Sequence, residues 1–451
     1  MCVFCPFRLR SLFILSIVLG WLSLLLPVGF TRSAAAQPAA VLPAAPAWTE
    51  LKVDLKQSRM KSKIWGILRA GEFADSKEQA FFDRYFWTYE FPRWTLVDNR
   101  EELAGHVSGT DRTDFRRDLR IALKNCGTGD KPRKVHEHLN KLTLQYMTRL
   151  VGNVDPLNPR TRCNFHPAIR VNAALMIGDL NAKESPTSSE PPVPLPAALR
   201  ELGKVVYGTD EQYPVAVKIA AMTGILRHTK LNAVPAGNIR TGIVTIMDRV
   251  LNTPNRTGKV AAGDAWLRAQ AAEVLGHLRE VGTNNKALVA LAKTAGDRRL
   301  PLYTRVAAAK ALGNLDYAMA VRLENGRQIA VALCQLAVDA VDGELAQENG
   351  QAPISRARLK ERLTAASSAL KGGFATVPGV PRTAGLHQLI DAMIKTVGSN
   401  QPDATVMEQI KVETDKLRRV LPGGSQPKTA PPQDVPPKPE ADEPPPPPPD
   451  S

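Results

Sequence analysis

TRVAAAKALGNL, at residues 304–315, is one copy of a segment that recurs along this chain and decides its fold. Two further copies read RVNAALMIGDL at 170–180 and LRAQAAEVLGHL at 267–278, and a looser copy reads VKIAAMTGIL at 217–226. The clear copies share a frame of two small residues, three variable residues, Gly, one variable residue and Leu. Such recurrence at intervals of tens of residues is typical of a repeat array, in which each unit buries its apolar face against its neighbours.

Each position of the frame has a packing role. Adjacent alanines, such as Ala308 and Ala309, favour a helix and let a neighbouring helix approach closely. Leu312 and Leu315 are large enough to fill the layer between units. Gly313, near the end of the segment, relieves crowding against the partner helix. The segment is therefore predicted to be the inner helix of a stacked helical hairpin.

Helical segments alternate with Pro, Gly and Asn from residue 132 onward, and they predict about six antiparallel pairs. Apolar residues recur at helical spacing, as at Ile239, Ile243, Ile246 and Val250. The expected first members are 132–151, 197–206, 238–251, 285–295, 326–341 and 383–397. The expected second members are 165–180, 212–227, 264–279, 302–315, 354–370 and 404–420. Strand signals are nearly absent, and the Ser/Pro-rich insertion at 182–196 is predicted to be a surface loop.

The recurring segment resembles the second helix of HEAT repeats, in which an arginine, small residues and Leu-Gly recur along an α-solenoid. Arg170, Arg268 and Arg305 stand at the basic position, eight residues before each glycine, and are called the frame arginines below. The resemblance implies an all-α fold, an α-α superhelix or HEAT-like solenoid. It also implies a hydrogen-bonded ladder of Arg and turn Asp residues, here Asp264 and Asp297. In the looser copy Ala216 replaces the arginine, so we expect the ladder to break there.

The ends of the chain differ from its middle. Residues 1–36 have the features of a signal peptide: Arg8 and Arg10, an apolar run at 11–30, and small residues for cleavage after Ala36. Export to the periplasm or the outside is therefore expected, or anchoring in a membrane if the apolar run is retained. An Ala/Pro-rich spacer (37–47), an aromatic-rich helical cap (48–129) and the solenoid (130–420) follow. The tail, 421–451, has thirteen prolines and is predicted to be disordered and polyproline-II-like.

Aromatic and basic clusters are the candidate partner-binding sites. Eight of the 25 aromatic residues fall within 81–94, where exposed rings would form a platform for sugars or a protein. Phe82, Phe86 and Tyr89 share a helical face, which favours packing over the first repeat instead.

The formal net charge is +15, so aligned arginines would attract acidic polymers, although interspersed acids favour ordinary solvated faces. The candidate residues are Arg112, Arg116, Arg117, Arg120, Arg356, Arg358, Trp87 and Trp94.

The sequence has no motif of a known catalytic, nucleotide-binding or metal-binding site, so no catalytic residue, cofactor or metal is predicted. His136 and His138 stand two residues apart and would point to different sides of a helix, which favours a solvated helix over a metal site. A Cys126–Cys163 disulfide is one option in an oxidising compartment, with Cys334 as a buried thiol.

These features favour an exported scaffold that binds a protein partner and is not an enzyme. HEAT arrays bind partners of many kinds, and no common active site accompanies the fold. The alternative is a binder of acidic polymers or cell-surface polysaccharide through the basic faces and the aromatic segment. A HEAT-like lyase is a more remote alternative, suggested by the resemblance alone. Nucleic acid is not expected as a partner, because the chain is predicted to be exported.

Overall fold

The computed structural model describes residues 47–99, 103, 115–128, 133–187, 189–349 and 355–421. The described residues from Trp48 onward form one compact unit. The predicted signal peptide, almost all of the spacer, the Pro-rich tail from 422 onward and Arg112 lie outside the described residues. Within those residues the predicted all-α class is confirmed, since helices dominate and the strands are two short segments.

The N-terminal part consists of short helices. They are η1 (Leu55–Met60), α1 (Lys61–Ala70), α2 (Ser76–Tyr85), η2 (Phe86–Glu90), η3 (Pro92–Thr95), η4 (Val97–Asn99) and α4 (Phe115–Gly127). The aromatic segment runs through α2, η2 and η3, and its rings are largely inside: Phe82, Phe91 and Trp94 are fully buried. The expectation that these rings pack in a core is therefore confirmed.

The remainder is a series of longer helices. They are α5 (Lys134–Val151), α6 (Pro167–Asp179), α7 (Pro196–Tyr207), α8 (Val215–Lys230), α9 (Asn238–Asn252), α10 (Ala261–Leu278), α11 (Lys286–Gly296), α12 (Leu302–Asn314), α13 (Gly326–Asn349), α14 (Arg356–Leu370), α15 (Gly373–Thr376), α16 (Ala384–Val397) and α17 (Asp403–Val420). Short turns η5 (Gly258–Val260), η6 (Thr283–Asn285) and η7 (Tyr317–Met319) lie between them.

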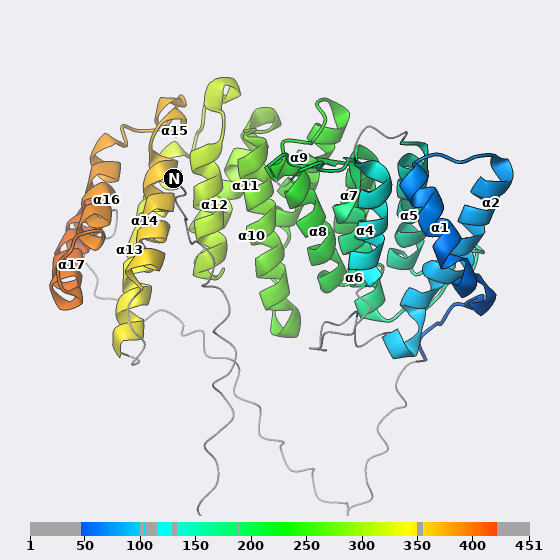
Figure 1. Ribbon diagram of the computed structural model, residues 1–451. Coiled ribbons are helices and arrows are strands. Elements are labelled where there is room, and N and C mark those ends of the chain that lie inside the picture. The colour runs from blue at the N-terminus through cyan, green and yellow to red at the C-terminus, as the bar shows by residue number, and fades with distance from the viewer. Residues whose placement is uncertain are drawn as a thin grey trace, which may run out of the picture. The chain divides into compact units, whose positions relative to one another are not determined.

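These helices form two layers (Figure 1). In the inner layer, α6, α8, α10, α12, α14 and α16 pack side by side in that order. The outer layer contains α5, α7, α9, α11 and α13, and each of these helices packs against the inner helix that follows it in the chain. The first five predicted helical pairs are therefore confirmed.

The last predicted pair, α16 and α17, also packs together, but its order in the two layers is the reverse of that in the first five pairs. The first member, α16, packs beside α14 in the inner layer, and the second, α17, packs beside α13. The Thr383 hydroxyl donates to the carbonyl of Leu370 at 2.8 Å, so α16 begins where α14 ends and the two run antiparallel. The connection between these two helices, which contains α15, packs against the core through buried Phe374 and Val377.

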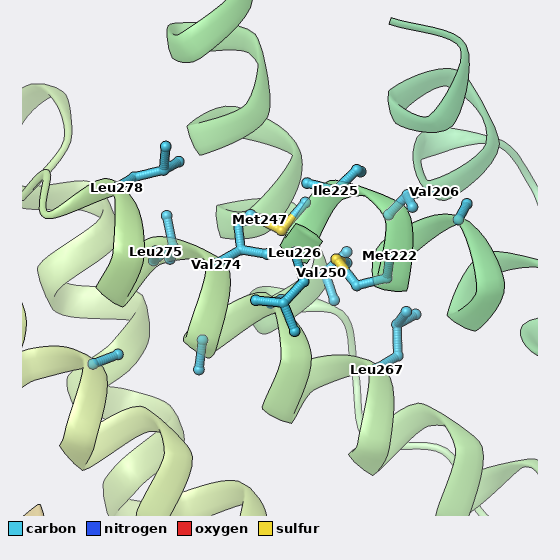
Figure 2. Close-up of a cluster of buried hydrophobic side chains, with 14 of the residues drawn as sticks. Val206, Met222, Ile225, Leu226, Met247, Val250, Leu267, Val274, Leu275 and Leu278 are labelled. Atoms are coloured by element: carbon cyan, nitrogen blue, oxygen red, sulfur yellow. The ribbon is translucent and has the colours of Figure 1, made fainter. Parts of the chain in front are cut away.

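Small residues bring the inner helices close together, as the frame predicted. A Cβ added to Gly178 would lie 2.7 Å from the Cα of Gly224, and one added to Gly276 would lie 2.9 Å from the Cα of Ala311. Apolar side chains fill the space between the layers. Figure 2 shows part of this core, where Val206, Met222, Met247, Val250 and Leu275 come from α7, α8, α9 and α10.

The insertion at 182–196 differs from its prediction as a plain loop. Its two ends pair as antiparallel strands β1 (Asn181–Lys183) and β2 (Val193–Pro194). Asn181 is buried, and its carbonyl accepts a hydrogen bond from the Asn140 side chain at 2.9 Å. The excursion is therefore fastened to α5 at its base. Alternation over only three residues is too short to give a strand signal in the sequence.

His228 on α8 is a buried histidine with an unusual environment. Its side chain is fully buried, and neither ring nitrogen has a hydrogen-bond partner among the described residues. Burial lowers its pKa to about 4, and the adjacent charge of Arg227 acts in the same direction. The folded protein therefore keeps this ring neutral at pH values where an unfolded chain would protonate it.

We expect this ring to weaken the fold in acid. Because its folded pKa is below the unfolded value of 6.5, the fold is unaffected above that pH and loses stability as the pH falls through 6.5 toward 4. His228→Leu removes the titration. Between about pH 7.5 and pH 4.5, the free energy of unfolding should fall by about 2 kcal/mol more in the wild type than in the variant. Urea unfolding at both pH values measures this, and an equal fall in the two proteins would contradict it.

Candidate functional site

The predicted basic sites are mostly occupied by contacts within the protein. Arg116 and Arg120 on α4 flank Asp179, with guanidinium-to-carboxylate distances of 3.8 and 3.7 Å, and Arg117 is exposed on the same helix. At the other end of the inner layer, Arg356 donates to the carbonyl of Ser399 at 2.9 Å.

Arg358 binds Glu344 with two hydrogen bonds of 2.5 and 2.8 Å. Helix α4 packs with α1, α5 and α6, whereas α14 packs with α12, α13 and α16. The two basic clusters therefore lie at different places in the fold, and several of their charges are paired within the protein.

The two tryptophans predicted as partner contacts differ in exposure. Trp94 is fully buried, so its expected role in an exposed platform is wrong. Trp87 is half-buried, and its ring lies 5.1 Å from the ring of Tyr146. The Arg149 guanidinium lies over the Trp87 ring, 5.6 Å from its centroid. Both rings pack within the N-terminal part, Trp87 against Tyr146 on α5 and Trp94 near Phe115 on α4.

His136 and His138 point to different partners, as predicted from their spacing. His136 lies 3.4 Å from Glu184, and His138 lies 2.5 Å from Asp83. His136 is fully buried, which corrects its prediction as part of a solvated face. Gly127 makes this possible, because a Cβ there would lie 2.6 Å from the His136 ring. The described residues contain no group of three or more His, Cys, Asp or Glu placed to hold a metal.

The cysteines do not form the suggested bridge. Cys126 is a buried free thiol, and Cys163 is a partly exposed one. The predicted burial of the Cys334 thiol is confirmed.

The frame arginines fasten each inner helix to the outer helix before it. Arg170 donates to the carbonyl of Val151 at 3.0 Å, and Arg305 donates to that of Ala295 at 3.0 Å. Arg268 donates to the carbonyl of Thr253 at 2.6 Å. These carbonyls lie at or just beyond the C-terminal ends of α5, α11 and α9, where backbone acceptors lack partners within their own helix. In each of these copies, the arginine of an inner helix therefore caps the C-terminal end of the preceding outer helix.

The predicted ladder of charged residues exists, but its course differs from the expectation. It does not break at Ala216, because Lys218 binds Asp210 at 2.7 Å and Asp210 also pairs with Arg256. Arg256 lies 3.6 Å from Asp264, which binds Arg268 at 3.0 Å.

Asp297 joins the ladder through a different partner from the one expected. Asn255 accepts from Arg268 at 2.8 Å and donates to Asp297 at 3.0 Å. Asp297 pairs with Arg299 rather than with a frame arginine, and that hydrogen bond lowers the pKa of Asp297 to about 2.

Arg362 on α14 is a further frame arginine that the sequence prediction missed. It bonds the fully buried carboxylate of Glu344 on α13 at 2.8 Å. The signal was present, because Arg362 precedes Ala365-Ala366 with the spacing Arg-x-x-Ala-Ala found in the clear copies. This copy was missed because Leu370 stands eight residues after Arg362, where the clear copies have glycine.

The exposed side of the inner layer carries a row of equivalent side chains. Trp266 and Tyr303 each stand two residues before a frame arginine, on the neighbouring helices α10 and α12, and are 41% and 44% exposed. Lys360 has the same position before Arg362 on α14 and is exposed. The Thr304 hydroxyl bonds the carbonyl of Ala265 at 3.0 Å, which places the two aromatic positions at one level. Trp266, Tyr303 and Lys360 are called the inner row.

Two hollows flank this layer at opposite ends of its helices. The larger, about 950 Å³, lies among the turns that follow α8, α10 and α12, and His277, Arg279 and Met319 contribute to its lining. Arg279 adopts the left-handed conformation with φ of 61°, and Met319 is 83% exposed. The smaller, about 230 Å³, includes Asp210 and Arg256 of the ladder.

No protein-family model, curated protein or solved structure matches the chain. In the part of the chain that the structure describes, no helix combines the length and apolar character needed to cross a membrane.

Proposed function

We propose that the protein is an exported scaffold of the HEAT-like solenoid type, which binds a protein partner through the exposed side of its inner layer and has no catalytic role. One observation supports this most strongly. Trp266 and Tyr303 expose large aromatic surface at equivalent positions of successive helices, while the paired alanines and the leucines of the frame, such as Ala308, Ala309 and Leu312, are buried. Aromatic side chains on a rigid support are enriched in protein-binding surfaces because they bury much area with little loss of entropy.

The spacing of the layers favours a concave binding surface. Inner helices approach closely at glycine and alanine, as at Gly276 and Ala311, and they pack against one another more extensively than the outer helices do. An array whose inner layer is more closely spaced curves toward that layer. Extended concave surfaces of this kind are what repeat proteins use to bind partners.

The inner row and the larger hollow would form one extended site. Both Trp266 and His277 belong to α10, and they are separated by eleven residues, or about 16 Å along the helix. His277 is exposed and also contributes to the lining of the larger hollow. An extended segment of a partner would therefore contact aromatic side chains at one end and charged side chains at the other.

Affinity capture tests this proposal. The full chain is used as bait for its native envelope fraction, either as wild type or with Trp266→Ala and Tyr303→Ala. Tyr207→Ala is the matched control, because Tyr207 is a 54% exposed aromatic residue at the end of outer helix α7. We expect the double variant to lose the partner, with recovery at least tenfold lower, and the control to retain it. Equal recovery by all three baits would contradict the proposal.

The alternative proposal, a binder of acidic polymers, has one feature in its favour. Arg117 and Lys124 remain exposed on α4, next to Ile121, which is 40% exposed. Binding through such a face depends on unscreened charge, so it would weaken strongly between low and moderate salt. The captured material therefore distinguishes the two proposals: a salt-resistant protein supports the scaffold, and a salt-sensitive polysaccharide supports the alternative.

A further inference from the structure

We propose that the inner row binds the six consecutive prolines of this chain's own tail, Pro444–Pro449. The tail would thereby occupy the partner surface of the same molecule. This inference rests on the proposed function and names a competing occupant of that surface. It is argued from the spacing of the inner row, the period of a polyproline-II helix, the charges and the length of the tail.

The spacing of the row matches the period of polyproline. Packed helices lie about 8 to 10 Å apart, so side chains at one level of α10, α12 and α14 recur at that interval (Figure 1). A polyproline-II helix has three residues per turn and a rise of about 3.1 Å, so equivalent residues recur every 9.3 Å or so. Proline-rich segments bind to aromatic-lined grooves by this kind of match, with little loss of entropy.

The sequence of the tail indicates which of its residues would contact each side chain of the inner row. Residues 444, 447 and 450 lie on one face of such a helix, and they are Pro, Pro and Asp. The row offers Trp266, Tyr303 and Lys360 in the same order. Pro444 would therefore lie on Trp266 and Pro447 on Tyr303. Asp450 would then meet the ammonium group of Lys360.

Charge and length allow the tail to reach this site. The tail after Leu421 has five acidic residues and two lysines, in a chain whose net charge is +15. Twenty-two residues separate Leu421 from Pro444. In an extended polyproline-like form they span about 68 Å, which exceeds the few helix spacings between α17 and α10.

A labelled peptide with the sequence of residues 443–451, EPPPPPPDS, tests the inference by fluorescence anisotropy. One protein is the full wild-type chain, and the other is the full chain with Pro444→Ala and Pro447→Ala in its tail. We expect the substituted chain to bind the peptide at least tenfold more tightly, because its own tail no longer competes. Competition by the tail of the same molecule does not depend on the protein concentration, so the difference should persist throughout the titration. Equal binding by the two proteins, or no binding to either, would overturn the inference.

Further variants in the tail-substituted chain test the register. Trp266→Ala should weaken peptide binding at least tenfold, Trp266→Phe should retain most of it, and Tyr207→Ala should leave it unchanged. Lys360→Glu should weaken binding about threefold, and a peptide with Asp450→Lys should restore it to that variant. An equal loss for Trp266→Ala and Tyr207→Ala, or no rescue by the reversed charge, would contradict the assigned contacts.

The result separates this inference from the proposed function. If the peptide does not bind but Trp266→Ala and Tyr303→Ala still abolish capture of the envelope partner, the tail inference fails and the scaffold proposal stands. If the peptide binds as expected and capture is unaffected by those substitutions, the scaffold proposal fails at this surface.

Discussion

Arg268→Ala is expected to lower the free energy of unfolding by about 3 to 5 kcal/mol, because it removes one partner of a buried ion pair. Arg268 is 2% exposed and binds Asp264, Asn255 and the backbone beyond α9. Its loss leaves the buried Asp264 carboxylate and a backbone carbonyl without that donor. Equilibrium urea unfolding of the full chain measures the change.

Two controls show whether the effect comes from the buried contacts. Arg69→Ala removes an exposed arginine whose Nε donates to the carbonyl of Trp65 within its own helix, and should change stability by about 0.5 kcal/mol or less. Adding Asp264→Ala to Arg268→Ala should cost less than the sum of the two single substitutions, because the unpaired carboxylate is then absent. Additive costs would show that the pair is not coupled, and a loss for Arg268→Ala as small as that for Arg69→Ala would contradict the capping role.

Gly178→Val is expected to destabilise the protein by about 3 kcal/mol, the upper part of the usual range for overpacked cores. The atom that an added Cβ would meet, 2.7 Å away, is the Cα of Gly224 in α8. Backbone atoms cannot rotate aside as a side chain does, so two inner helices would have to separate. Thermal and urea unfolding of the full chain measure the loss.

Gly242→Ala on outer helix α9 is the matched control. A Cβ at Gly242 meets no atom within 4 Å, and its φ is not positive. This substitution should leave stability unchanged or raise it by about 0.5 to 1 kcal/mol, because alanine loses less entropy in a helix. If Gly178→Val and Gly242→Ala behaved alike, close approach of the inner helices would not be a stabilising feature.

The sequence predicted the helices well because burial repeats with the helical period. Residues such as Ala308, Ala309 and Leu312 are buried at the positions that the frame assigns to packing. The reversed order of α16 and α17 was not predictable in this way. The connection between α14 and α16 packs against the core through buried Phe374, and a tertiary contact of this kind leaves no periodic signal in the sequence.

The candidate site was predicted less well, because residue type does not reveal the partner of a side chain. The sequence does not reveal that Arg358 binds Glu344. It also does not reveal that Trp94, a candidate for partner binding, is buried. The inner row had a readable signal. Trp266 and Tyr303 both stand two residues before the spacing Arg-x-x-Ala-Ala, and comparison of the copies at that position would have identified them.

Position-specific photo-cross-linking tests the central claim, that the exposed side of the inner layer binds a protein. A photoreactive phenylalanine analogue replaces Tyr303 on α12 or, as the control, Tyr207 on α7, in the full chain with Pro444→Ala and Pro447→Ala. After irradiation in the native envelope, we predict a discrete cross-link to a protein partner from position 303 and none from position 207. Cross-linking from position 207 alone, or from neither position, would contradict the claim.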